Sequence, residues 1–172
     1  LGRAKVVYLV MDGAVWLWDL AHDRFAEAIK TLDFHHAREH LQAIADALHG
    51  VGTNQARAWF KPLLHSLRHG QEARVVRTLE ELLLALPPGR TLKDQADLER
   101  EVNYFQTHRD HLHYQKMEDA GAPLGSGAAE SLGKKLQGRL RGCGQFWLRS
   151  GFTNLLRVCV LTKNKDETYL WN

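Results

Sequence analysis

The sequence predicts an α/β fold that is mostly helical by residue count, and two observations carry this prediction. First, an apolar, strand-like segment, residues 5–11, is followed by a helical segment, 14–21, and by a second strand-like segment, 28–32. Two strands joined through a helix are expected to pair in parallel. Second, from residue 35 onward the apolar residues recur only at helical spacing, so no further strand is expected.

The expected helices share an apolar stripe and end at glycine or proline. His108, His111 and His113 lie on the longest and most highly charged of them and are expected to face solvent. The helices are expected over residues 37–49, 59–69, 79–86 (before Pro87-Pro88-Gly89) and 93–118, with two more beyond, one carrying Glu130 after a break at 121–127 and one over 147–164.

Composition limits what the chain can be. With 172 residues and 44% hydrophobic content, it can bury one core or at most two compact lobes. No apolar run approaches the length of about 20 residues that spans a membrane, and the start, with Arg3 and Lys5, lacks a secretory signal pattern. Two cysteines without a CxxC spacing, Cys143 and Cys159, fit packing positions in a reducing cytosol rather than a disulfide framework.

Two strands alone make an incomplete sheet. Both edges are open, and apolar residues such as Val6, Tyr8, Val10 and Ile29 have nothing to cover them within the pair. Further strands or a partner chain are therefore expected, and the chain is interpreted as the C-terminal part of a longer α/β protein.

Each predicted strand ends in an acid. Asp12 follows the first strand and Asp33 follows the second. Ligands of open α/β sheets gather at the carboxyl ends of the strands, which favours a functional role for both acids. The alternatives are a surface turn for either residue and, for Asp33, the N-cap of the helix that follows it.

Three separated motifs have a recognisable order and spacing. They are Met11-Asp12-Gly13-Ala14 with Trp16 and Phe25, residues 32–41, and residues 123–131. Together they resemble the DDE transposases of bacterial insertion sequences in the Mutator-like group. The resemblance implies a ribonuclease-H-like core, residues 1–36, a large all-helical insertion, residues 37–122, and C-terminal core helices, residues 123–172.

The resemblance also implies site residues. Asp12 corresponds to the second catalytic Asp and Glu130 to the catalytic Glu, both as ligands of Mg²⁺ or Mn²⁺. Asp33 and His36 match a Cys-or-Asp, two residues, His signature and imply a supporting role. The first catalytic Asp of the family lies upstream of the strand that ends in Asp12, and only eleven residues precede Asp12. The chain is therefore expected to be a C-terminal fragment without that acid, and inactive alone.

Phosphoryl transfer explains why carboxylates are needed. Strand cleavage and strand transfer are in-line displacements at phosphorus, in which two divalent ions about 3.5–4 Å apart stabilise the attacking and leaving oxygens. Carboxylates are the ligands that Mg²⁺ prefers. Glu130 also has a plainer interpretation, since a helical ion pair with Lys134 would contribute about 0.2–0.5 kcal/mol.

Residues 134–157 contain no acid, although the net charge of the chain is only +3. Such a basic block favours a polyanion as partner, and the resemblance implies DNA, both element ends and target, with a homo-oligomer at the nucleoid in the bacterial cytoplasm. Phe146 and Trp147 lie within the block and either stack on a base or pack in the core. The basic residues are Lys134, Lys135, Arg139, Arg141, Arg149 and Arg157, and the first five of these are the predicted DNA-binding residues.

The sequence also fits two functions other than that of a transposase. His36-x-x-Glu39-His40 matches a zinc-protease pattern in which two histidines bind Zn²⁺ and the glutamate is the general base, but no third-ligand motif follows. A non-catalytic, helical DNA-binding module would use the same basic block to neutralise phosphates without metal-dependent chemistry.

Overall fold

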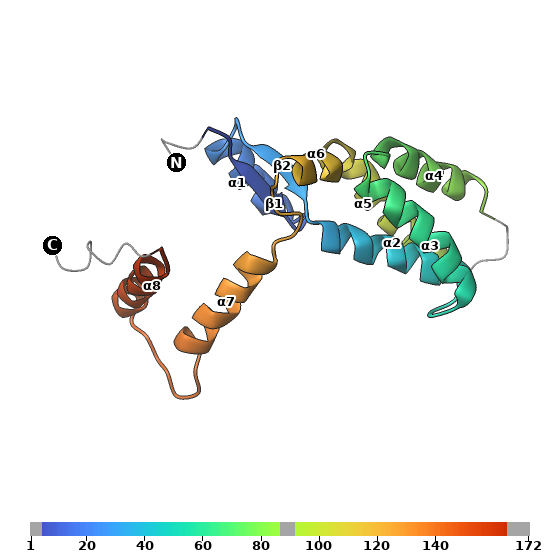
Figure 1. The fold of residues 1–172 in the computed structure, drawn as a ribbon. Helices are drawn as coiled ribbons and strands as arrows, with labels where there is room; N and C mark the ends of the chain where they lie inside the picture. The colour runs from blue at the N-terminus through green and yellow to red at the C-terminus, as the bar shows by residue number, and fades with distance from the viewer. Residues whose placement is uncertain (1–4, 87–91, 165–172) are drawn as a thin grey trace. The chain divides into compact units, whose positions relative to one another are not determined.

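The computed structural model describes residues 5–86 and 92–164. These residues form eight α-helices, one short 3-10 helix and a two-stranded parallel sheet, and 70% of them are helical. The chain divides into two compact units, Leu1–Ser126 (unit 1) and Gly127–Asn172 (unit 2). The predicted mixture of α and β structure, mostly α by residue count, is therefore present (Figure 1).

A β-α-β unit builds the sheet of unit 1. Strand β1 (Tyr8–Met11) leads into helix α1 (Val15–Arg24), which returns to strand β2 (Ile29–Leu32). The two strands are parallel, which confirms the predicted parallel pair. Both strands are shorter than the predicted segments, 5–11 and 28–32.

The register of the two strands places both strand-end acids at one edge of the sheet. Met11 pairs with Leu32 as the last pair of the ladder. The backbone N–H of Asp33 donates to the carbonyl of Met11 at 2.7 Å and extends the pairing by one step. Asp12 and Asp33 therefore follow immediately at the same carboxyl edge.

The sheet is covered only in part within unit 1. Met11 and Leu32 are buried, together with Trp18 of α1. Val6 is 52% exposed and Ile29 is 40% exposed. The apolar surface that the sequence predicts to be uncovered is thus accessible along the strands in this unit.

Four helices form the main core of unit 1. Helix α2 packs against α3 and α5, and α4 packs against α3 and α5 (Figure 1). Thr53 accepts a hydrogen bond from the Ala56 N–H at 3.0 Å and caps α3, which is why that helix begins before the predicted apolar stripe. The predicted stop at Pro87-Pro88-Gly89 lies outside the described residues. The bounds are α2 Phe34–His49, α3 Asn54–Arg68, α4 Glu72–Leu84 and α5 Leu92–Thr107.

The prediction of one long helix over 93–118 is wrong. Helix α5 ends at Thr107, a 3-10 turn η1 (Arg109–His111) follows, and α6 covers Tyr114–Asp119. Leu112 and Tyr114 are both fully buried. In a continuous α-helix, residues two apart point to nearly opposite sides. The break allows both side chains to enter one core.

The same break corrects the prediction for the histidines. His108 is buried and its ring stacks against Trp18, with ring centroids 5.2 Å apart. His111 is half-buried, 4.2 Å from the same indole, and Nε2 of His113 lies 3.1 Å from the carbonyl of Lys30. None of the three faces solvent freely, because the turn after α5 directs them towards α1 and β2.

Unit 2 is a pair of helices joined by a loop. Helix α7 (Gly127–Leu140) packs against α8 (Arg149–Asn164). Cys159 is buried between them, whereas Cys143 is exposed in the loop. The predicted packing role of the cysteines therefore holds for Cys159 and is wrong for Cys143.

Candidate functional site

Asp12 occupies a tight turn at the end of β1. Its Oδ1 accepts a hydrogen bond from the Ala14 N–H at 3.0 Å, and its side chain is exposed. Gly13 has φ +91°, a backbone conformation that favours glycine. The geometry is that of a local turn, and it leaves an exposed carboxylate at the carboxyl edge of a parallel sheet, where a cation can reach it.

Tyr104 of α5 contacts this turn and was not found from the sequence. Its hydroxyl donates to the backbone carbonyl of Asp12 at 3.1 Å. The two residues are 92 positions apart. No motif or spacing in the sequence links them, so only the fold could have revealed the contact.

Asp33 is buried, with a relative exposure of 1%, and is the N-cap of α2. Its Oδ1 accepts from the backbone N–H groups of His35, at 2.7 Å, and His36, at 3.4 Å. Its Oδ2 accepts from the backbone N–H of Ser126 at 2.6 Å. The capping interpretation of Asp33 is therefore confirmed, and the same carboxylate also holds a distant loop.

The pKa of the Asp33 carboxyl is lowered from its ordinary value. Burial acts to raise this pKa, but hydrogen bonds from Ser126 and from the backbone of His35 and His36 outweigh it. Asp33 therefore stays ionised, and its oxygens are already engaged as acceptors. This engagement favours a structural role in support of the site over direct cation binding.

The loop that precedes α7 is fastened to the end of β2. The backbone N–H of Phe34 donates to the carbonyl of Leu124 at 2.9 Å, beside the bond between Asp33 and Ser126. Gly125 lies so close to His35 that an added Cβ would be 2.7 Å from its ring. The motif at residues 32–41 and the first part of the motif at 123–131 are thus neighbours in unit 1.

Two histidines of α2 lie beside acids of unit 1. Nδ1 of His36 lies 3.7 Å from Oδ1 of Asp33. Nδ1 of His40 lies 2.5 Å from Oε2 of Glu101, so one ring nitrogen of this predicted zinc ligand is already engaged. In the part of the chain that the structure describes, no group of three or more His, Cys, Asp and Glu residues is arranged to hold a metal ion.

Glu130 lies in the first turn of α7, in unit 2, and its side chain is exposed. A shallow pocket next to it is lined by Ser131, Lys134 and Lys135. A carboxylate and two ammonium groups therefore share one surface of α7. The two ammonium groups make this surface suitable for a phosphate.

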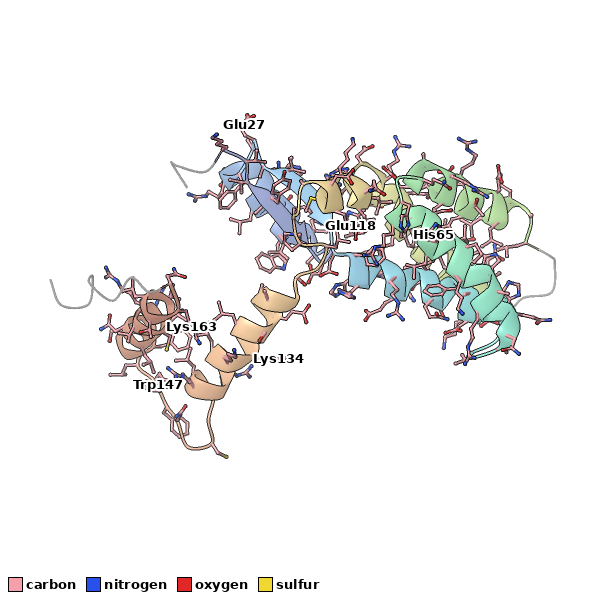
Figure 2. The ribbon with its side chains drawn as sticks, viewed as in Figure 1. Glu27, His65, Glu118, Lys134, Trp147 and Lys163 are labelled. Atoms are coloured by element: carbon pink, nitrogen blue, oxygen red, sulfur yellow. The ribbon has the colours of Figure 1, made fainter. Side chains whose placement is uncertain are left out.

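A second pocket of unit 2 is basic as well. Lys135, Arg139 and Lys163 line it, and the buried Cys159 forms part of its wall. Figure 2 shows Lys134 on α7 and Lys163 on α8. The side chains of Arg141 and Arg149 are exposed too, so all five predicted DNA-binding residues are accessible in this unit.

The two aromatic residues of the basic block differ in their surroundings. Phe146 is 95% exposed. Trp147 is 41% exposed and donates from Nε1 to the carbonyl of Leu140 at 2.9 Å, which closes the loop between α7 and α8 (Figure 2). Neither ring lies in the core: Trp147 is exposed but anchored by this hydrogen bond, and Phe146 is almost fully exposed.

Comparison of the chain with protein-family models, curated proteins and solved structures found no match. Among the helices of residues 5–86 and 92–164, none is long and apolar enough to cross a membrane.

Proposed function

We propose that this chain belongs to a DNA transposase of the DDE type with a ribonuclease-H-like core. The observation that carries the proposal is the arrangement at the carboxyl edge of the parallel sheet. Asp12 presents an exposed carboxylate there, and Asp33 at the same edge holds the loop that leads into the helix of Glu130. This is the order and connection that the three motifs would need in order to build one site.

The chemistry of the donors fits a hard divalent cation. Asp12 and Glu130 are exposed carboxylates, and Mg²⁺ or Mn²⁺ prefers such oxygens. When bound, the cations would activate the attacking oxygen and stabilise the leaving oxygen of a phosphodiester. Asp12 and Glu130 bind and orient in this scheme, and a third carboxylate would come from a segment outside these 172 residues.

The accessible cations of unit 2 support DNA as the substrate. Lysine and arginine side chains neutralise phosphates without reading sequence, which suits a protein that must hold both element ends and varied target DNA. We place further copies of the chain in the working complex, because cleavage and joining act on two element ends. The five residues are Lys134, Lys135, Arg139, Arg141 and Arg149.

A non-catalytic DNA-binding module is the second candidate. The observation that favours it is that the basic surface belongs to unit 2, whereas Asp12 belongs to unit 1. Phosphate binding by unit 2 does not need Asp12. In this alternative DNA binding does not require Mg²⁺, and Asp12 is only a turn residue.

Cleavage by a longer chain tests the proposal. A protein that also carries an upstream strand with the third acid should nick DNA at the inverted repeats that flank its gene, and only with Mg²⁺ or Mn²⁺. Asp12→Asn and Glu130→Gln should each reduce cleavage to background, while Asp19→Asn, at an exposed acid of α1, should not. Residues 1–172 alone should be inactive. Cleavage that survives both substitutions would contradict the proposal.

A further inference from the structure

We infer that Tyr104 is a positioning residue for Asp12. Its hydroxyl fixes the backbone of the Asp12 turn, so that the carboxylate is presented in one orientation to a divalent cation. This inference rests on the proposed role of Asp12 as a metal ligand. It makes the helical segment between β2 and α7 a working part of the site rather than a separate module.

The contact between Tyr104 and the turn is close. The Tyr104 hydroxyl donates to the carbonyl of Asp12 at 3.1 Å. A Cβ added to Gly13 would lie 2.9 Å from both Cε2 and Oη of Tyr104, so the ring lies against the turn itself. On the carboxylate side, Oδ1 accepts from the Ala14 N–H. The turn is therefore restrained through its peptide carbonyl and through its side chain.

Tyr104 is itself held in place from α2 and α5. The ring of His40 stacks on that of Tyr104, with centroids 3.6 Å apart and planes at 22°. His40 is fixed in turn by its 2.5 Å contact with Glu101. The edge of the Tyr104 ring also meets His108, at a centroid distance of 4.9 Å. A chain of three supported side chains thus ends at the acid, as in the outer shells that orient metal ligands.

The hydroxyl of Tyr104 remains a donor at any ordinary pH. Burial first, and the charges of Asp12, Asp33, Glu101 and Glu39 second, raise the pKa of this phenol well above its usual value.

A second tyrosine provides a matched control. Tyr114 is fully buried, and its hydroxyl has no hydrogen-bond partner among residues 5–86 and 92–164. Replacing either tyrosine with phenylalanine removes one oxygen. Only at Tyr104 does that oxygen hold the turn of a proposed ligand, so a difference between the two variants reports on positioning rather than on the loss of a hydroxyl.

The test is a titration of the ¹⁵N-labelled chain with Mn²⁺, read as paramagnetic broadening of the backbone amides of Gly13 and Ala14. We expect saturable broadening in the unaltered chain and none in Asp12→Asn. Tyr104→Phe should raise the half-saturating Mn²⁺ concentration by about 3- to 10-fold, the effect of losing one hydrogen bond. Tyr114→Phe should leave it unchanged. Glu101→Gln weakens the contact that fixes His40 but does not alter the Asp12 turn. This variant should raise the half-saturating Mn²⁺ concentration less than Tyr104→Phe does.

The outcomes separate the two proposals. If Asp12→Asn abolishes the broadening but Tyr104→Phe titrates like the unaltered chain, the positioning role is overturned and the metal site stands. An equal effect of Tyr114→Phe would also overturn the positioning role. If broadening survives Asp12→Asn, or never saturates, the metal site itself is overturned, and the inference with it. Should Tyr104→Phe not fold, Glu101→Gln decides, since an unchanged titration in that variant rejects the supporting chain.

Discussion

The carboxylate of Asp33 accepts a 2.6 Å hydrogen bond from the backbone N–H of Ser126, which lies 93 positions further along the chain. One buried acid therefore caps α2 and fastens the loop that leads into α7. The end of β2, the start of α2 and the loop before α7 are joined at a single side chain. One side chain thus supports both the start of α2 and the loop that precedes α7.

Replacing Asp33 with alanine should lower the free energy of unfolding by about 2–3 kcal/mol. The substitution leaves the N–H groups of His35 and Ser126 without their acceptor, and an unpaired buried donor costs about 1–3 kcal/mol. Urea unfolding of the full chain measures the change. Asp23→Ala, at an exposed acid paired with Arg24 on the surface, should change the free energy by less than about 0.5 kcal/mol.

The contribution of Asp33 to the free energy of unfolding should decrease at acidic pH. Its pKa in the folded protein lies below the ordinary value of 3.8. The ionised carboxylate therefore contributes its full stability above pH 3.8, and the contribution is lost as the pH falls through the lower folded pKa. The stability gap between the unaltered chain and Asp33→Ala should be constant near neutral pH and should narrow below pH 3.8. A gap that widens on acidification would contradict this assignment.

Gly125→Ala tests the close approach of the loop to α2. An added Cβ would lie 2.7 Å from the ring of His35, so the ring must move, at a cost of about 1 kcal/mol in the free energy of unfolding. Gly127→Ala is the matched control, because a Cβ there would meet no described atom of its own unit within 4 Å. Combining Gly125→Ala with His35→Ala should remove most of the cost. If the double variant is as unstable as the sum of the two single variants, the contact is not the cause.

Features of this fold that depend on neighbouring residues are predictable from the sequence, whereas features that depend on contacts between distant residues are not. The parallel strand pair and the cap at Asp33 follow from neighbouring residues, and both are confirmed. The end of α5 at Thr107 depends on whether Leu112 and Tyr114 reach one core, and residue spacing alone did not show that. The wrong prediction that His108, His111 and His113 face solvent has the same cause, because it assumed an unbroken helix.

The same distinction between local and distant contacts applies to the candidate site. The acids at the strand ends can be predicted from the residues around them. The contact between Tyr104 and Asp12 cannot, because the two residues are 92 positions apart in the sequence. A single tyrosine on a helix has no distinguishing neighbours in sequence. It acquires a role only because α5 passes the end of β1, and this depends on how the whole helical core packs. The roles of Asp12 and Glu130 stay predictions for the experiments above.

His108 should make stability sensitive to mildly acidic pH. Burial first, and nearby His40 second, lower its pKa below the ordinary value of 6.5. As the pH falls through 6.5 the unfolded chain takes up a proton that the folded protein resists, so stability is lost. His108→Gln should make the free energy of unfolding fall less steeply with decreasing pH, by up to about 1.4 kcal/mol per pH unit. His65→Gln, at an exposed residue of α3 (Figure 2), is the control for replacing a histidine with glutamine.

The basic block of unit 2 should bind DNA by charge, with little preference for sequence. Each lysine or arginine that neutralises a phosphate releases counterions, so the slope of log K against log salt falls by about 0.9 for every phosphate that is no longer neutralised. Replacing Lys134, Lys135, Arg139 and Arg141 with alanine should therefore weaken binding and flatten this slope by up to about 3.6 units, measured by fluorescence anisotropy between low and moderate salt. Lys61→Ala, at an exposed lysine of α3, is the control for net charge. A slope that the four substitutions leave unchanged would mean that DNA binds to a surface other than the basic block, which would contradict this prediction.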